Sequence, residues 1–366
     1  MVNAYALAGV DSGKIKMFER IMGEVGEKTR DFSQARNVVV ESLAHSASFR
    51  YLGSESHLWA KTLEGLGNKN WLAEWMYKFG DMLPHYFEVG IDTILMAAND
   101  VITSGARPVL IMDEISAGDS EWFADEIRTC DLGRGYYWVA KKINATFGGG
   151  ESASLRYLVK PLDPVFSAPV MSASVTGIIN PAHQKITEDV QAGDVILGAR
   201  SSGMHANGYS LALARGLALK DQFMTKLPSG RKLGIELLEP TRSYVGLVEA
   251  LLDSEVKISA FMPATGDGVS KICKLGHFTF EIHSWVKVHE IFEFMLELGI
   301  QIRDCLTTFN WGVGYYVFVR PEHVSRAVKS AYRAGFDLVE IGQVKNDGDH
   351  CVVFGPEGGL ILSPPH

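Results

Sequence analysis

Seven polar junctions, most of them rich in glycine, constrain how this chain can fold. Each places small residues beside a carboxylate, an amide or a lysine near the end of a predicted helix or strand, and they lie at residues 9–14, 64–69, 97–100, 148–152, 202–208, 264–268 and 308–314. Glycine lets the backbone approach a ligand closely, and successive free N–H groups at a helix start favour phosphate oxygens. One such cluster is more often an ordinary turn. Seven in one chain indicate an enzyme that handles a nucleotide or a phosphate.

Segments with helical and strand patterns alternate between these junctions. The first half has a predicted helix over 91–104 that ends at Gly105, and predicted strands over 109–113 and 168–179. A charged helix is expected from about Asp119, with Gly133 and Gly135 breaking it. The second half has predicted strands at 194–199, 315–320 and 350–355. One predicted helix begins at Asn207 and others span 241–254, 288–300 and 322–335, and the tail after 355 is expected to be irregular. This alternation predicts an α/β or α+β fold.

The length and composition narrow the class of protein. With 366 residues the chain is long for one core, and the polar segment 180–194 is the expected boundary between domains 1–180 and 181–366. A net charge of −8 without a run of Lys and Arg makes nucleic acid or an anionic membrane a poor partner. The four cysteines form no CxxC pair, so no zinc site or disulfide framework is expected. Without a recognisable signal peptide or membrane-length apolar segment, we expect a cytoplasmic protein.

The junction motifs occur in an order that is similar to one enzyme family. They are YALAGVD (5–11), EGLGNK (64–69), GIDTILMAAND (90–100), GARPVLIMD (105–113), GGGES (148–152), SSGMHANGYSL (201–211), LLEPTRSYV (237–245), ATGDG (264–268) and TFNWGVG (308–314). The set resembles the phosphoribosylformylglycinamidine cyclo-ligases, also called AIR synthetases, from Tyr5 to about Gly342. SSGMHANGYSL and TFNWGVG favour this family over its relatives, which include thiamine-monophosphate kinase, selenophosphate synthetase and a hydrogenase-maturation protein.

The resemblance implies a fold and a reaction. The fold would have two α/β domains, and a homodimer would form through the N-terminal halves around a shared barrel, with ATP and Mg²⁺ near that interface. The substrate would be a small nucleotide, formylglycinamidine ribonucleotide (FGAM). ATP would phosphorylate its formyl oxygen, and closure of the imidazole ring would give aminoimidazole ribonucleotide (AIR), ADP and phosphate. Catalysis of this kind depends on charge neutralisation and positioning.

The resemblance also implies site residues. The candidate Mg²⁺ ligands are Asp100 and Glu151, followed by Glu64 and Asp92, since hard oxygen ligands suit Mg²⁺. Asp92 is explained equally well as a helix N-cap. The candidate nucleotide contacts are Lys14, Gly65, Gly67, Asp92, Gly149, Gly150, Thr265 and Gly266. Lys69 would be a point charge for phosphate, whereas a solvated surface position is at least as well supported for Lys14.

The SSGMHANG junction supplies the remaining candidates. His205 would move a proton or bind the substrate phosphate. Asn207 would hydrogen-bond the substrate or cap the following helix, and both roles can hold together. Asn310 and Gly312 are better explained as the residues of a tight turn. Together with Lys69, His205 and Asn207 are therefore the expected catalytic residues.

Five departures from the family pattern lie in or next to the loops that carry these candidate site residues. Glu64 stands where the family has Asp, Asn68 where it has Thr, Pro263 usually where it has His, and Asp267 where it has the middle Gly of T-G-G-G. The stretch after Glu151 reads SASLRY, which lacks the second carboxylate and the proline–glycine turn of the family. Three hypotheses follow: a divergent cyclo-ligase, another ATP-dependent enzyme of the same fold, or a non-catalytic ATP-binding subunit. The joint presence of Asp100, Glu151, Lys69, His205 and Asn207 argues against the third, and we favour the first.

Overall fold

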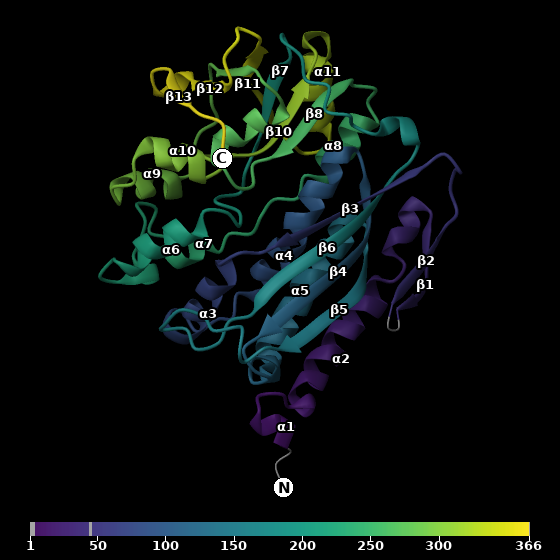
Figure 1. The fold of residues 1–366 in the computed structure, drawn as a ribbon, viewed down its shortest axis with the longest axis vertical. Helices are drawn as coiled ribbons and strands as arrows, with labels where there is room; N and C mark the ends of the chain where they lie inside the picture. The colour runs from purple at the N-terminus through teal and green to yellow at the C-terminus, as the bar shows by residue number, and fades with distance from the viewer. Residues whose placement is uncertain (1–3, 44–45, 366) are drawn as a thin grey trace.

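The computed structural model describes residues 4–43 and 46–365, and within these a four-stranded sheet forms the centre of the N-terminal half (Figure 1). Its strand order is β3 (Leu58–Gly65), β6 (Val170–Ile179), β4 (Arg107–Ala117) and β5 (Thr146–Ser154). Strands β4 and β5 are parallel, and the other pairs are antiparallel. Helices α2 (Ser12–Thr29), α4 (Tyr86–Val101) and α5 (Glu126–Ile143) pack on one face. We call the opposite face the open face, because the hairpin of β1 (Val38–Leu43) and β2 (Ala47–Tyr51) covers only one end of it.

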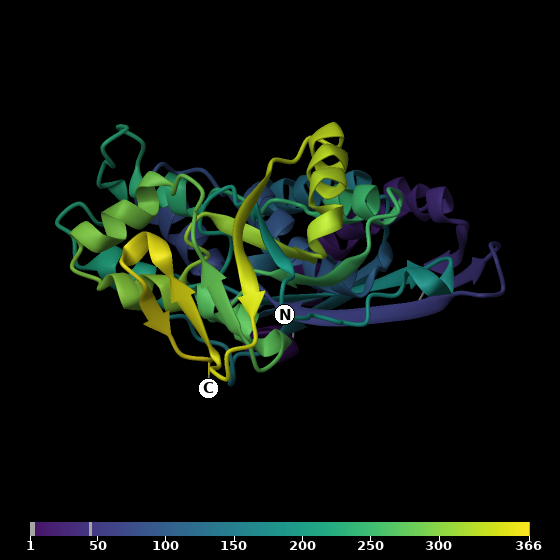
Figure 2. The same ribbon diagram turned by 90° about the horizontal axis from the view of Figure 1, so that it is seen from above.

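The C-terminal half is built on a second, larger sheet. Within the described residues it has seven strands in the order β13 (Leu360–Leu362), β12 (Cys351–Phe354), β9 (Thr279–Ile282), β11 (Leu338–Lys345), β7 (Val195–Arg200), β10 (Val313–Val319) and β8 (Ile258–Pro263). Its helices are α6 (Tyr209–Leu217), α7 (Leu233–Leu237), α8 (Val245–Leu252), α9 (Glu290–Glu297), α10 (Ile302–Thr308) and α11 (Val324–Arg333). Figure 2 shows β12 and β13 at one edge of this half, away from α11.

The predicted α/β class is confirmed, and most predicted elements are present. The strands expected at 168–179, 194–199 and 350–355 are β6, β7 and β12. Segment 180–194 joins the two sheets, and α3 (Lys69–Phe79) lies on the same side of the molecule as α6 and α7 (Figure 1). The four cysteines are free. Among the described residues, no helix is both long and apolar enough to cross a bilayer.

Two predictions about local structure are wrong. The tail after 355 is not wholly irregular, because Leu360–Leu362 pairs with β12 as strand β13. Helix α5 is capped by Asp125 rather than Asp119, and it runs without a break through Gly133 and Gly135. A Cβ at Gly135 would overlap the carbonyl oxygen of Phe87, on the neighbouring helix α4. These glycines therefore let helices approach one another closely and do not end the helix.

The close approach of α4 and α5 predicts opposite effects for alanine at two helical glycines. Gly135→Ala should destabilise the protein by about 1–3 kcal/mol, because the added methyl group must displace the backbone of α4. The matched control is Gly23→Ala in α2, where a Cβ would meet nothing within 4 Å. In that variant the free energy of unfolding should rise by about 0.5–1 kcal/mol, because alanine loses less conformational entropy than glycine when a helix forms. Urea denaturation measures both, and a stabilised Gly135→Ala would contradict the packing argument.

Candidate functional site

A buried ion pair joins the two halves of the chain. The Lys69 ammonium, in the first turn of α3, lies 2.6 Å from Oδ2 of Asp92 in α4, and neither side chain has any exposed surface. The same ammonium donates to the main-chain carbonyls of His205 (3.0 Å) and Glu239 (2.6 Å) in the C-terminal half. Asp92 Oδ1 accepts from the N–H of Thr241 at 2.8 Å and from the Thr241 hydroxyl. These contacts fix how the two halves meet.

This arrangement corrects the predicted roles of Lys69 and Asp92. The Lys69 ammonium is surrounded by three oxygens of the protein, so it is not positioned as a charge for phosphate. Asp92 lies in the second turn of a helix that begins at Tyr86, so it is not an N-cap, and both of its carboxylate oxygens face protein donors. A charge removed from water is stable only when its partners replace the water. Both residues therefore hold the structure together.

His205 is likewise part of the scaffold. It lies in the left-handed region (φ 61°) of the loop between β7 and α6, and only 2% of it is exposed. Burial lowers the pKa of its imidazole to about 3, and the positive charge of Lys69 adds to the effect. The neutral ring accepts a hydrogen bond at Nε2 from the N–H of Ser202 (3.3 Å). Proton transfer and phosphate binding by His205 stay predictions; within the chain its ring is buried and held by Ser202.

The asparagines of this region have different roles. The Asn310 side chain donates to the carbonyl of Gly203 (2.8 Å) and accepts from the N–H of Gly312 (2.9 Å), which confirms the expected turn. Asn207 does not cap α6, because Gly208 (φ 78°) takes that position and no side chain caps the helix. The Asn207 amide nitrogen is buried and has no hydrogen-bond partner among the described residues. It is therefore a donor that a ligand could use.

Two acidic side chains meet where β3 packs on α4. The Thr62 hydroxyl donates to the carbonyl of Ala97 in α4 (2.9 Å), and Glu64, two residues further along β3, interacts with Asp100 in the last turn of α4. Burial raises the pKa of Asp100 to about 6; Lys271 opposes this rise and the neighbouring Glu64 adds to it. Asp100 Oδ1 is buried with no hydrogen-bond partner in the described part of the chain. Two close carboxylates with a free buried oxygen suit a hard divalent cation.

A lysine of the C-terminal half faces this acidic pair. Lys271 belongs to the 3₁₀ segment Gly268–Leu275, and its ammonium donates to Oγ1 of Thr265 at 2.6 Å. Burial lowers the pKa of Lys271, and the charges of Asp100 and Glu64 oppose that shift. Gly266 (φ 64°) has open space where a Cβ would lie. Sequence reasoning missed Lys271, although its place directly after the ATGDG motif was an available indication.

Glu151 does not join the acidic pair. Glu64, Ala173, Asp113 and Gly150 form one cross-strand row, and Glu64 faces α4. Successive residues of a strand point to opposite faces, so Glu151 projects from the open face and is exposed. Among the described residues, no group of three or more His, Cys, Asp or Glu side chains is arranged to hold a metal ion. The predicted set of Glu64, Asp100 and Glu151 is therefore not assembled within one chain.

The remaining glycines and Lys14 lie in separate surroundings. A Cβ at Gly150 would overlap the carboxylate of Asp113, whose pKa burial raises to about 7. Gly150 thus makes room for a side chain that sequence reasoning did not single out. Gly149 (φ 97°) has open space around it. Lys14 forms an ion pair with Glu121, so its charge already has a partner within the chain.

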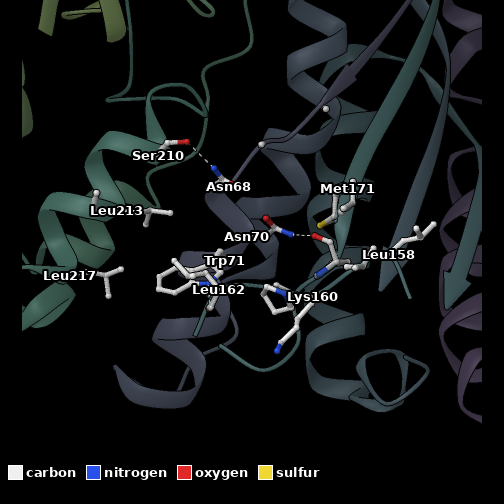
Figure 3. Close-up of a pocket in the computed structure, with 18 residues that line it drawn as sticks. Asn68, Asn70, Trp71, Leu158, Lys160, Leu162, Met171, Ser210, Leu213 and Leu217 are labelled. Atoms are coloured by element: carbon white, nitrogen blue, oxygen red, sulfur yellow. Dashed lines mark hydrogen bonds between the residues drawn. The ribbon is translucent and has the colours of Figure 1, made fainter. Parts of the chain in front are cut away.

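A cavity of about 650 Å³ opens between the halves, next to the loop that follows β3 (Figure 3). Gly65 and Gly67 form part of its wall, and α6 forms the opposite wall. The Asn68 amide donates to Oγ of Ser210 in α6 (3.0 Å), which links the two walls. A ligand in this cavity would lie beside the residue that follows Glu64.

Comparison with known proteins identifies the family. The descriptions "AIR synthase related protein, N-terminal domain" and "AIR synthase related protein, C-terminal domain" match residues 59–179 and 191–354. The chain is also 30% identical over 338 residues to phosphoribosylformylglycinamidine cyclo-ligase of Thermococcus gammatolerans, covering 91% of this chain and 94% of that protein. The chain belongs to the AIR synthase related protein family.

Solved structures of this fold show how widely it is used. A hydrogenase maturation protein, HypE, in complex with ATP matches with a TM-score of 0.60 and 16% identity, covering 88% of this chain and 89% of that one. Thiamine-monophosphate kinase from Stenotrophomonas maltophilia matches with a TM-score of 0.60 and 18% identity, covering 88% and 96%. At these identities the likeness concerns the fold alone.

The structure shows the surroundings of three departures from the AIR synthase pattern. Asn68 uses its amide to bridge to Ser210 across the cavity. Asp267, in place of a glycine, keeps the left-handed conformation (φ 54°), which Asp tolerates better than most residues. Its carboxylate pairs with Lys274 at 2.6 Å, so its negative charge is balanced. Pro263 ends the edge strand β8.

The contact between the halves predicts a large cost for breaking the buried ion pair. Lys69→Met should destabilise the protein by about 3–5 kcal/mol, because it leaves the Asp92 carboxylate buried without its cation. The double variant Lys69→Met/Asp92→Asn should be more stable than Lys69→Met alone, because Asn retains an acceptor for Thr241 without the charge. Chemical denaturation gives the free energies of unfolding.

A surface ion pair provides the control for this prediction. Arg20 and Glu24 in α2 lie 2.8 Å apart with both side chains more than half exposed. Arg20→Met should therefore change the free energy of unfolding by no more than about 0.5 kcal/mol. An equal decrease in the free energy of unfolding in Arg20→Met and Lys69→Met would refute a special role for the buried pair.

Proposed function

We propose that this chain is an ATP-dependent cyclo-ligase that converts FGAM to AIR with release of ADP and phosphate. The observation that carries the proposal is the pairing of Glu64 with Asp100 opposite Lys271 and Thr265, where the two halves of an AIR synthase related chain meet. The similarity to a named cyclo-ligase over 91% of the chain supports the same reaction.

The chemistry follows from the poor leaving ability of a formamide oxygen. Transfer of the γ-phosphoryl group of ATP to that oxygen makes it a good leaving group. The amidine nitrogen of the same substrate then attacks the activated carbon, and phosphate departs as the ring closes. Little bond chemistry is required of the protein, which must hold the reacting atoms together and balance the phosphate charges.

We assign roles to the groups that the fold leaves available. Glu64 and Asp100 would hold Mg²⁺, which supplies neutralisation of the phosphate charge when it is bound. Lys271, held by Thr265, would balance further negative charge from the C-terminal side. The free amide of Asn207 would hydrogen-bond the substrate. The open backbone at Gly149 and Gly266 would admit the nucleotide, whereas Gly65 and Gly67 line the cavity between the halves.

We also propose that the chain works as a homodimer through its open face. Leu63 and Val170 project from this face with 69% and 58% of their surface exposed, which leaves apolar area in water. Glu151 and its cross-strand neighbour Glu114 lie on the same face. Glu151 can therefore serve as a metal ligand only in a site that a second copy completes.

An assay with FGAM, ATP and Mg²⁺ that follows both ADP and AIR tests the reaction. Asp100→Asn should lower turnover by on the order of 10- to 100-fold, because one metal-binding oxygen becomes an amide. The matched control is Asp349→Asn on the exposed loop before β12, which should leave turnover unchanged. Circular dichroism of each variant reports whether the fold is intact.

The products decide between the alternatives. Equal formation of ADP and AIR supports the cyclo-ligase. Release of ADP without AIR would mean that the chain phosphorylates another acceptor, and failure to bind ATP in calorimetry would exclude both enzymes. Undiminished turnover in Asp100→Asn would show that the metal assignment is wrong.

The proposed dimer predicts that a charge on the open face separates the subunits. Leu63→Glu should weaken dimerisation at least about tenfold, because a carboxylate would be buried between two apolar surfaces. The control is Ile361→Glu, because Ile361 is an exposed apolar residue of the C-terminal half. It should leave the mass of the sedimenting particle unchanged. Analytical ultracentrifugation measures both variants. A wild-type protein that sediments as a monomer at all concentrations would contradict the proposal.

A further inference from the structure

We propose that the cavity between α3 and α6 binds a small, mostly apolar molecule with a single negative charge, at a site separate from the reacting groups. The volume of about 650 Å³ lies within the range of roughly 300–1,000 Å³ that is usual for small-molecule sites. The inference does not depend on the identity of the reaction proposed above.

The lining of the cavity is largely apolar and comes from both halves. The N-terminal half contributes Trp71 of α3 and Met171 of β6, and the C-terminal half contributes Leu213 and Leu217 of α6. Figure 3 shows these side chains on opposite sides of the space. A ligand that displaces water from such walls gains from the burial of apolar surface on both sides.

A connecting segment completes the cavity with exposed leucines. Residues 158–162, which follow β5, contribute Leu158 and Leu162, and these are 82% and 73% exposed. The end of the segment is held in place, because the Trp71 indole N–H donates to the carbonyl of Leu162 (2.8 Å). The Asn70 amide donates to the carbonyl of Pro169, further along the same connection. Two apolar side chains are thus held at the cavity in contact with water. An apolar ligand would cover them.

The charge of the lining defines the ligand further. Lys160 is the one charged side chain among the described residues that line the cavity. The carboxamides of Asn68 and Asn70 already donate to protein oxygens. One cation and few free donors suit a single carboxylate or sulfonate group. They suit a ribonucleotide poorly, because its phosphate carries up to two charges and its ribose needs several hydrogen bonds.

The position of the cavity connects it to the reacting groups. Glu64 faces Asp100 on α4, whereas the next residue, Gly65, lines the cavity. Gly67 and Asn68 of the same loop also line it. A bound ligand would therefore contact the loop that carries Glu64 without occupying the place of the nucleotide.

Two fluorescent probes of the same shape and different charge test the site. The anionic probe is 8-anilinonaphthalene-1-sulfonate, and the neutral one is N-phenyl-1-naphthylamine. Wild-type protein should bind each at one saturable site per chain. Leu158→Glu should weaken both probes at least about tenfold, because it places a carboxylate in the apolar wall. Lys160→Met should weaken the anionic probe about two- to fivefold and leave the neutral probe unchanged.

Leu52→Glu is the control, because Leu52 is 62% exposed and lies outside the cavity. It should bind both probes as wild type does. Two results of the binding assay would overturn the proposal: binding that does not saturate, and unchanged binding in Leu158→Glu. Two further results would also overturn it: displacement of the probe by FGAM or by ATP with Mg²⁺, and a monomeric Leu158→Glu variant where the wild type is a dimer. Displacement would make the cavity part of the reaction site, and dissociation would make it part of an interface between copies.

Discussion

The buried contact of Lys69 with Asp92 is the constraint on which the rest of the site depends. Through its additional bonds to the carbonyls of His205 and Glu239, the Lys69 ammonium connects the loop after β3 to two loops of the C-terminal half. Buried charges tolerate little displacement, because any gap leaves them without water and without a partner. We infer that this contact fixes the register of the two halves. That register brings Lys271 toward Glu64 and Asp100.

The same contact explains why several residues with reactive side chains have structural roles. His205, Asp92 and Lys69 belong to types that perform catalysis, and they occur in motifs shared with an enzyme family. The structure buries all three and gives each of them partners within the protein. A polar network at a domain contact needs hydrogen bonds of defined direction, and ionisable side chains provide them. Residue type alone does not distinguish this use from chemistry, because burial is a property of the fold.

The sequence predicted the fold class and most elements, because hydrophobic periodicity and turn residues are local properties. The β6 strand and the α4 helix follow directly from such patterns. Prediction from the sequence failed where the conformation of a residue is determined by residues distant in the chain. Gly135 continues a helix because Phe87 of another helix approaches it, and Glu151 faces away from Glu64 because of the alternation along two paired strands. The partnership of Lys271 with Thr265 and the acidic pair likewise exists only after the halves meet.

At the end of β3, neighbouring residues contribute to two different places, the acidic pair and the cavity. The Glu64 side chain turns toward α4 and Asp100, while the backbone of the next residue, Gly65, lines the cavity. Departures from the family pattern occur on both sides of this segment, since Glu64 belongs to the acidic pair and Asn68 to the cavity. Asn68 contributes to the wall of the cavity, and Asp100 of the acidic pair keeps the family residue. Changes in the cavity can therefore alter what binds there with little effect on the acidic pair, which is packed against a different layer of the protein.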